Sequence, residues 1–164
     1  AEGAGPPACH VDEHAGYDGV AFTWGMSFRV ADAAECCAAC RAHAAVCSAG
    51  ESSSEFFHAS GQKGPTACGS QGSGAEQCNV WVFCGEEKCW SSDIHDHTFG
   101  ECWLKHQADP SRPRSPSRGA YPPEFRAEHS TAPELVQWTS GAIVPPGVEV
   151  VPGPASWQKA TDGA

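Results

Sequence analysis

The sequence predicts a small, disulfide-rich α+β domain in which one short helix is tied to β-strands by disulfides. Ten cysteines occur among 164 residues, and three of them fall in one alanine-rich segment, 32–43. Two later segments, 78–84 and 101–105, combine cysteine with the β-branched or aromatic residues that strands favour. At this length we expect one domain rather than two.

The alanine-rich segment has the start signal and the composition of a helix. Asp32 is a favourable N-cap, and Glu35, three residues later, completes a capping box. The alanines that follow have high helix propensity. Cys36 and Cys40 are four residues apart and share one helix face, whereas Cys37 points about 100° away from Cys36. The helix therefore offers thiols in two directions, to which strands and the N-terminal segment can be tied.

Composition predicts a secreted chain of the extracellular matrix or cell surface that disulfides hold together. Only 22 of the 164 residues are Leu, Ile, Val or Phe, which is below the roughly 20 % at which burial alone usually holds a domain. Each disulfide contributes on the order of 2–4 kcal/mol, and an even cysteine count points to an oxidising compartment. The chain has neither an initial Met nor an apolar signal segment, so we expect Ala1 to be a processed start. Since it has no run of 18 apolar residues, we expect no membrane span.

The net charge of −10 argues against nucleic acid as a partner. Binding to phosphates needs a basic face, and acidic residues outnumber basic ones by 20 to 10. The charge fits a soluble surface, or a contact made through calcium or with a basic partner.

The first part of the chain is expected to hold a lead-in and the domain itself. Residues 1–16 are expected to be an irregular lead-in that carries Cys9, and residues 17–108 to form the domain. Within it, 17–30 is expected to contain a half-buried strand with alternating apolar residues, namely Val20, Phe22 and Trp24. The segment 48–77 is rich in Ser and Gly, has almost no periodicity, and is expected to be an inserted loop.

Two further strands are expected on either side of a polar loop. Residues 78–84 are apolar on both faces, so we expect them to form the central strand, covered on both sides. In the strand 101–105, Cys102 and Leu104 are expected to point inward, and Trp103 to point to the opposite face.

After the last cysteine the composition changes. Residues 109–133 are rich in Pro and Ser and are expected to be an extended, solvated connector. Residues 134–164 are expected to be a strand-forming tail, with a strand or strand pair at 134–144 broken at Ser140-Gly141. Free proline-rich tails are usually disordered. Because this tail has no cysteine, we expect non-covalent contacts, and not disulfides, to order it.

Three motifs, in this order, resemble the PAN/Apple domain family: Cys36-x₃-Cys40 in the helix, Cys78-Asn-Val-Trp-Val-Phe, and Cys102-Trp-Leu-Lys. The resemblance covers about residues 9–105. The doubled Cys36-Cys37, the Trp-x-Phe-Cys of the central strand and the later Trp-x-Ser-Gly at 138–141 look like the PAN modules of green-algal extracellular proteins. The resemblance implies a helix joined to a small antiparallel sheet, and a role in binding proteins or polysaccharides.

The resemblance also implies a disulfide pattern. It makes Cys36–Cys102 and Cys40–Cys78 the links between helix and strands. Local proximity then favours Cys84–Cys89 and Cys47–Cys68, which leaves Cys9 with Cys37. Other patterns stay open, because ten cysteines allow about nine times the 105 pairings of eight.

Few residues are arranged for chemistry. Two groups have spacings found in metal sites: His10 with His14, and Asp93 with His95, Asp96 and His97. The first needs a helix where the sequence looks irregular, and the second lies in a polar loop, so we expect no metal or cofactor. Cys37 and Cys40 are expected in structural disulfides, and no nucleophile elbow, phosphate loop or catalytic carboxylate pair is present, so we expect no enzyme.

Candidate contact residues lie in the loops and the tail. Trp90 and Trp157 have loop-like surroundings, where tryptophan either packs against the loop or offers a platform for sugar rings or protein anchors. The remaining candidates are Val148, Val150 and Val151 for partner contacts, and Ser111, Pro113, Ser115, Pro116 and Ser117 for O-linked sugar.

Two functions follow from these expectations. The first is a secreted, non-enzymatic adhesion or assembly module, a structural subunit of an extracellular filament or matrix that uses its C-terminal tail for contacts with itself or other proteins. The alternative is a monomeric PAN/Apple binding module that recognises a protein or carbohydrate. The two differ in whether the tail packs on its own core or on another chain.

Overall fold

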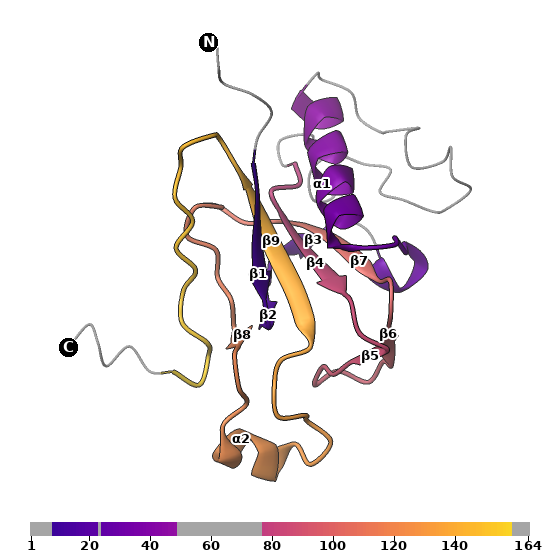
Figure 1. Cartoon of the computed structure of the whole chain (residues 1–164), viewed down its shortest axis with the longest axis vertical. Helices are drawn as coiled ribbons and strands as arrows, with labels where there is room; N and C mark the ends of the chain where they lie inside the picture. The colour runs from indigo at the N-terminus through magenta and orange to yellow at the C-terminus, as the bar shows by residue number, and fades with distance from the viewer. Residues whose placement is uncertain (1–7, 23, 49–76, 159–164) are drawn as a thin grey trace, which may run out of the picture.

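A five-stranded antiparallel sheet forms the centre of the computed structural model, which describes residues 8–22, 24–48 and 77–158. The strand order is β1-β9-β4-β7-β3 (Figure 1). The five strands are β1 (Ala8–Glu13), β9 (Trp138–Val144), β4 (Val80–Cys84), β7 (Cys102–His106) and β3 (Val20–Ala21). The fold is therefore α+β with an antiparallel sheet, as predicted.

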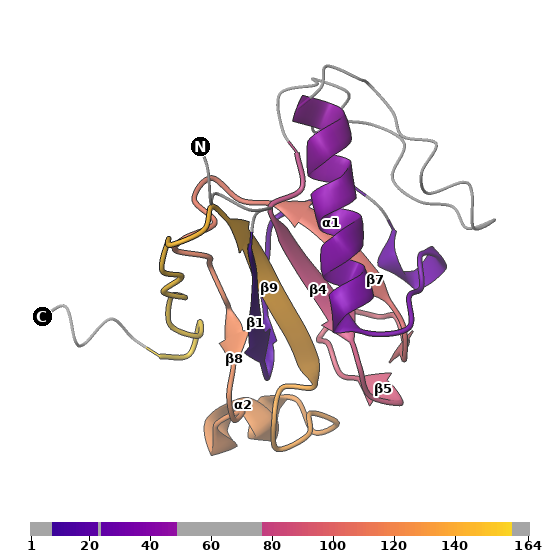
Figure 2. The same cartoon turned by 45° about the horizontal axis from the view of Figure 1, so that its top comes forward.

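The helix α1 (Ala33–Ser48) covers one face of this sheet and lies in front of β4 and β7 in Figure 2. It begins as predicted, since the Glu35 N–H donates to Asp32 Oδ1 at 2.9 Å, and the Glu35 carboxylate accepts from the Ala31 N–H at 3.3 Å. It continues past the expected end near His43, because the Ala-Ala-Val-Cys that follows contains no helix breaker.

Strand β4 is the central strand, as predicted. All five of its residues are buried, because both faces of the sheet are covered there. Trp81 and Phe83 pack under α1 together with Leu104 of β7. Val80 and Val82 belong to a second apolar cluster on the opposite face.

Disulfides join the helix to the sheet. The described residues contain four, Cys9–Cys37, Cys36–Cys102, Cys40–Cys78 and Cys84–Cys89, and these are the same four pairs as expected above. Cys47 is also disulfide-bonded. Its expected partner Cys68 and most of the insertion 48–77 lie outside the described residues.

The N-terminal expectations need correction. Residues 8–13 of the expected irregular lead-in form β1, which pairs with β9 along its whole length. This strand is at the sheet edge, where its half-buried residues His10 and Asp12 are polar and Val11 is exposed, so its sequence lacks an apolar signal. The strand expected in 17–30 is reduced to β3 and a 3₁₀ turn, η1 (Gly25–Ser27). At Gly25 the indole of Trp103 occupies the space where a side chain would lie.

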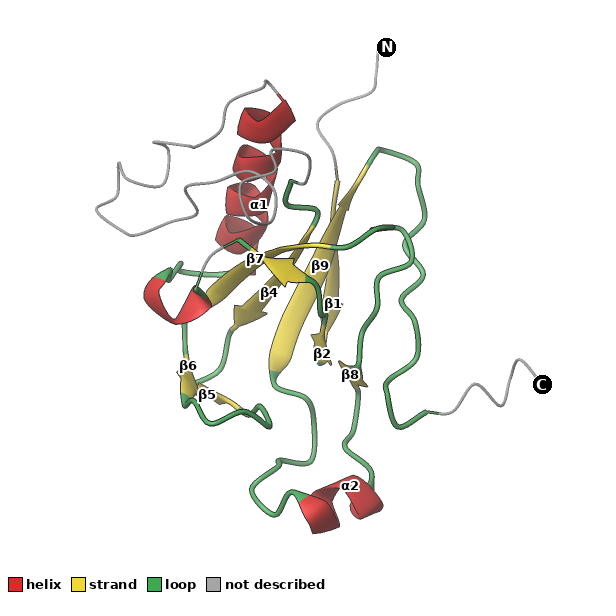
Figure 3. Cartoon of the chain, turned by 180° about the vertical axis from the view of Figure 1, so that it is seen from behind, coloured by secondary structure: helices red, strands yellow, loops and turns green. Residues whose placement is uncertain are grey.

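The segment 109–133 is not a solvated connector. It contains β8 (Ser117–Arg118), which pairs with β2 (Ala15–Gly16), and the short helix α2 (Pro123–Glu128) (Figure 3). Pro113 and Tyr121 are buried. The prediction made from the high content of proline and serine was wrong, because the backbone of these residues is hydrogen-bonded to other segments of the chain.

The C-terminal segment also belongs to the domain. Strand β9 lies inside the sheet, between β1 and β4. Farther on, the N–H groups of Val151 and Gly153 donate to the carbonyls of Ser111 and Pro113 at 2.8 and 2.9 Å. The expected boundaries at 108 and 133 must therefore be removed, because the strands and hydrogen bonds that complete the fold cross both of them.

Strand β9 runs without interruption through Ser140-Gly141, where a break was expected. The Ser140 hydroxyl donates to the Ala15 carbonyl at 2.8 Å and accepts from the Tyr17 N–H at 3.0 Å. A Cβ at Gly141 would collide with the Trp81 indole and the His10 carbonyl oxygen. These two small residues therefore let β9 enter the sheet between its neighbours.

The smaller β5 (Lys88–Cys89) and β6 (His97–Thr98) form a separate two-stranded ladder beyond the end of β4. In the part of the chain that the structure describes, no helix combines the length and apolar character needed to cross a bilayer.

The close approach at Gly141 yields a stability prediction. We expect Gly141→Ala to lower the free energy of unfolding by about 3 kcal/mol, because neither a packed indole nor backbone can move aside. Gly153→Ala is the control, since its added Cβ would meet the Pro113 oxygen at an ordinary 3.7 Å. Guanidinium denaturation with the disulfides intact measures both, and equal stabilities would contradict the position of β9.

Candidate functional site

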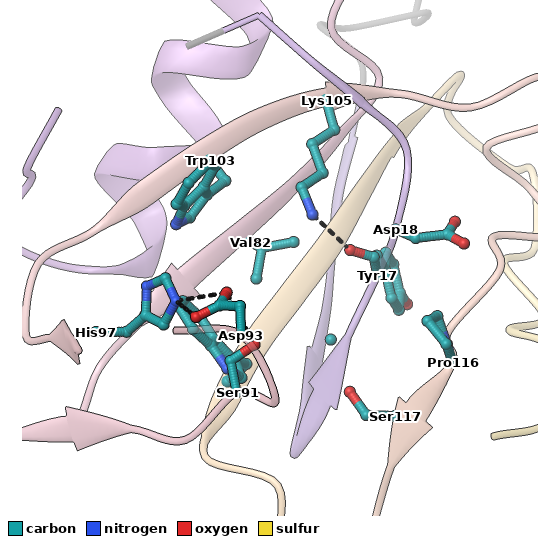
Figure 4. A pocket seen from close by; sticks show the side chains of 12 residues that line it. Tyr17, Asp18, Val82, Ser91, Asp93, His97, Trp103, Lys105, Pro116 and Ser117 are labelled. Carbon is teal, nitrogen blue, oxygen red and sulfur yellow. Dashed lines mark hydrogen bonds and ion pairs between the residues drawn. The ribbon is translucent and has the colours of Figure 1, made fainter. Parts of the chain in front are cut away.

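A pocket of about 300 Å³ opens on the sheet face opposite α1 (Figure 4). Val82 of β4 and Trp103 of β7 are register partners, and Lys105 lies two residues beyond Trp103, so all three point to this face. Trp138, at the start of β9, is the second tryptophan of the lining. The remaining polar side chains of the lining come from loops and from β6 and β8: Asp18, Ser91, Asp93, His97 and Ser117.

Both tryptophans of the pocket are held by their indole nitrogens. Trp103 Nε1 donates to Glu101 Oε1 at 3.2 Å, and Trp138 Nε1 donates to the Trp90 carbonyl at 2.9 Å. Gly25 leaves the space in which the Trp103 ring lies. The aromatic lining is therefore fixed in place by contacts outside the pocket.

His97 is held between two carboxylates. Its Nδ1 lies 2.7 Å from Glu101 Oε1, and its Nε2 lies 2.9 Å from Asp93 Oδ2. A neutral imidazole has only one N–H, so only the charged form donates to both carboxylates. Burial disfavours that charge, but hydrogen bonds and the charges of Glu101 and Asp93 outweigh burial and raise the pKa of His97.

The buried Glu101 carboxylate has further donors. It accepts from the Thr98 N–H at 2.8 Å, and Arg29 lies 3.9 Å away. For Asp93, burial favours the neutral acid, but the hydrogen bonds from His97, the His95 N–H and Ser91, together with the charge of His97, outweigh burial and lower the pKa. The His97 network thus holds an ionised Asp93 at the pocket.

Lys105 brings an ammonium group into the pocket. Its Nζ donates to the Tyr17 carbonyl at 3.0 Å, and burial lowers the pKa of Lys105 to about 8, against a weaker opposing effect of Asp18. Asp18 itself is paired with Arg114 at 3.0 Å. No ion pair joins Lys105 to a carboxylate within the described part of the chain.

The two groups of residues with metal-site spacing do not form a set of metal ligands in the described part of the chain. Within residues 8–22, 24–48 and 77–158, no three His, Cys, Asp or Glu side chains are grouped to hold a metal ion. Both nitrogens of His97 are hydrogen-bonded, and the exposed His95 contacts the ring of Trp24 instead. His14 lies just beyond the end of β1, which contains His10, and its Nδ1 is 2.9 Å from the Val136 carbonyl.

The two tryptophans expected in loops pack in an aromatic cluster. Trp90 contacts Tyr121 and Phe125, and Trp157 packs against the same two rings. The most exposed tryptophan among the described residues is Trp24, which was expected to alternate with Val20 and Phe22 on the apolar side of a half-buried strand. Trp90 and Trp157 thus anchor α2 and the C-terminal segment.

The other expected contact residues are divided between surface and interior. Val148 and Val151 are exposed, whereas Val150 is half-buried. Pro113 and Ser115 are buried, and the Ser115 hydroxyl donates to the Gly153 carbonyl, so neither can carry a sugar in the folded chain. Ser111, Pro116 and Ser117 are half-buried.

Sequence reasoning missed the pocket residues Trp103, Lys105, Trp138 and Asp93 as a group. One signal was present, since the outward side of the strand 101–105 combines a tryptophan with a lysine two residues later. The segments that complete the pocket come from residues 16–18, 91–97 and 116–117, and no local pattern predicts that they meet.

Comparisons of the chain with protein-family models, with curated proteins and with solved structures find no match. Two indole rings provide apolar surface, the Asp93 carboxylate accepts hydrogen bonds, and the Lys105 ammonium donates them. Such a lining suits a small ligand that has both an apolar face and hydroxyl groups.

The His97 network yields a pH prediction. We expect His97→Gln to lower the free energy of unfolding by about 3 kcal/mol at pH 5.5, because it leaves the buried Glu101 without its main partner. The pKa of His97 is raised in the folded chain, so its stabilisation is full below the unfolded pKa near 6.5 and is lost as the pH rises through the folded pKa.

Denaturation at pH 5.5, 7 and 9 checks this prediction. His95→Gln, an exposed histidine of the same loop, is the control and should have a small effect at each pH. A destabilisation by His97→Gln that stays constant across this range would show that His97 is not charged in the folded protein.

Proposed function

We propose that this chain is a secreted, non-enzymatic PAN/Apple-like module that binds carbohydrate through the pocket opposite α1. The observation that carries the proposal is the combination of Trp103 and Trp138 with the Asp93 carboxylate in one open pocket. The apolar faces of sugar rings pack on indole, and their hydroxyls need acceptors and donors beside that surface.

Two structural features support rigid binding at this pocket. The tryptophans are fixed by hydrogen bonds of their indole nitrogens, and Asp93 is held by the buried His97. A site whose side chains are already ordered loses less conformational entropy when a ligand binds. The side chains of the pocket are therefore ordered before a ligand binds.

The PAN/Apple assignment is supported by how the helix is joined to the sheet. Cys36–Cys102 connects α1 to β7, and Cys40–Cys78 connects it to the residue two positions before β4, as the resemblance implies. The number of disulfides supports secretion, since such bonds persist in oxidising compartments.

Binding to a panel of immobilised oligosaccharides, followed by calorimetry with those retained, tests the function. We expect Trp103→Leu to weaken binding about tenfold, because stacking of a ring on an aromatic side chain is worth about 1–3 kcal/mol and tenfold corresponds to about 1.4 kcal/mol. Asp93→Asn should weaken it while preserving the shape of the pocket. Trp157→Leu removes an indole from the aromatic cluster and should leave the affinity unchanged.

Assembly through the tail was the function first expected from the sequence, and the main reason for expecting it no longer holds. It rested on a tail without contacts to its own domain, whereas β9 and residues 151–156 contact other segments of the same chain. We therefore place binding first, and infer that the protein is a monomer. In the described part of the tail, Leu135, Val148 and Val151 are exposed apolar residues on which contacts with another chain could form.

Sedimentation velocity over a hundredfold range of concentration tests the monomer. We expect one species with the mass of a single chain at every concentration. A species that grows with concentration, and that Val148→Lys with Val151→Lys abolishes, would restore assembly as the leading function.

A further inference from the structure

Among the described residues that line the pocket, one cation forms no direct ion pair with a carboxylate. Asp18 is paired with Arg114 at 3.0 Å, and Asp93 is paired with His97 at 2.9 Å. These are the two carboxylates that line the pocket, and each has a cation other than Lys105. Among the described residues, the Lys105 ammonium is therefore the cation of this lining that has no carboxylate at ion-pair distance.

The position of this ammonium makes it available to a ligand. Lys105 reaches from β7 into the space between Trp103 and Tyr17, as Figure 4 shows. An ammonium has three N–H donors, and the Tyr17 carbonyl takes one of them. Two donors remain, and the side chain that carries them lines the pocket together with the aromatic ring of Trp103.

We propose that the pocket selects a sugar that carries a negative charge, such as a hexuronate, with its carboxylate bound to Lys105. This inference rests on the proposed function and specifies its ligand. Asp93, Ser91 and Ser117 lie in the same lining and can hydrogen-bond the hydroxyls of the sugar. The ring then lies against one of the two indoles.

The energetics of Lys105 agree with this role. An ammonium that is buried without a carboxylate loses hydration that a single carbonyl does not replace, and burial lowers its pKa to about 8. Groups with such perturbed pKa values concentrate at functional sites. An anionic ligand would supply the missing partner.

The overall charge of the chain limits what is bound. With a net charge of −10, the protein repels long polyanions at a distance. Recognition depends on one ammonium in one pocket, so the site takes a single acidic unit. This differs from binding by a basic surface patch, where affinity grows with the number of charges.

Matched pairs of methyl glycosides test the inference on the full chain. The two members of each pair differ only at carbon 6, which is a carboxylate in one and a hydroxymethyl group in the other, in the gluco, galacto and manno configurations. Titrations followed by NMR give the affinities. We expect the acidic member of at least one pair to bind about tenfold more tightly, since a hydrogen bond to a charged group adds that much.

Lys105→Met keeps the length of the side chain and removes the charge, so it should abolish the preference for the acidic member. Lys88→Met removes an exposed lysine outside this pocket and should keep the preference. Because a buried unpaired charge is removed, Lys105→Met should melt no lower than the wild type, which separates lost binding from lost folding.

The outcomes distinguish this inference from the function on which it rests. If neutral glycosides bind and acidic ones do not, the charge selection is wrong and the carbohydrate site stands. If no glycoside shifts the signals of Trp103 or Trp138, both proposals are overturned. If sulfated glycosides bind as tightly as the uronates, the site reads charge without distinguishing carboxylate from sulfate, which still supports an anionic sugar.

Discussion

The whole sheet depends on the entry of β9 between β1 and β4. This strand comes last in the chain and occupies the second position in the sheet, so both of its neighbours need it as a hydrogen-bonding partner. Two small residues allow β9 to lie between its neighbours. The Ser140 hydroxyl is hydrogen-bonded to the backbone of Ala15 and Tyr17, and Gly141 leaves room for the Trp81 indole. The N-terminal and C-terminal parts of the chain are therefore folded as one unit.

The two faces of the sheet are stabilised in different ways. On the helix side, three disulfides join α1 to β1, β7 and the segment before β4. On the other side, no disulfide joins residues beyond Cys102, and rings such as Tyr121, Phe125 and Trp157 pack together instead. The pocket lies on this second side, where loops and the strands β6, β7 and β8 supply its polar residues. Covalent links thus hold the scaffold while weaker contacts shape the site.

The sequence predicted those elements whose signal is local. Asp32 and Glu35 marked the start of α1, and a run that is apolar on both faces marked β4 as the central strand. Strand β1 was missed because an edge strand with polar residues on one side has no apolar alternation. Strand β9 was partly predicted as a strand, but its place in the sheet depends on contacts with residues more than 120 positions away.

The pocket could not be predicted for the same reason. Trp103 and Lys105 were visible as the outward side of a strand, but their meaning depends on which segments cover that side. Lys105 points to an anionic ligand only because Asp18 and Asp93 are each paired with another cation. Charge balance within a site is a property of three-dimensional neighbours, and the totals in a composition do not contain it.

The late position of β9 has a consequence for how the protein is made. All ten cysteines precede residue 103, so every disulfide partner leaves the ribosome before the strand that completes the sheet. Disulfides can therefore begin to form while β1 and β4 are not yet joined by β9. Contacts between distant segments form slowly, and β9 is the last strand of the sheet to be synthesised. Any cysteine pairing that starts at this stage is made without β9, so the final strand acts only on disulfides that have already formed or are still exchanging.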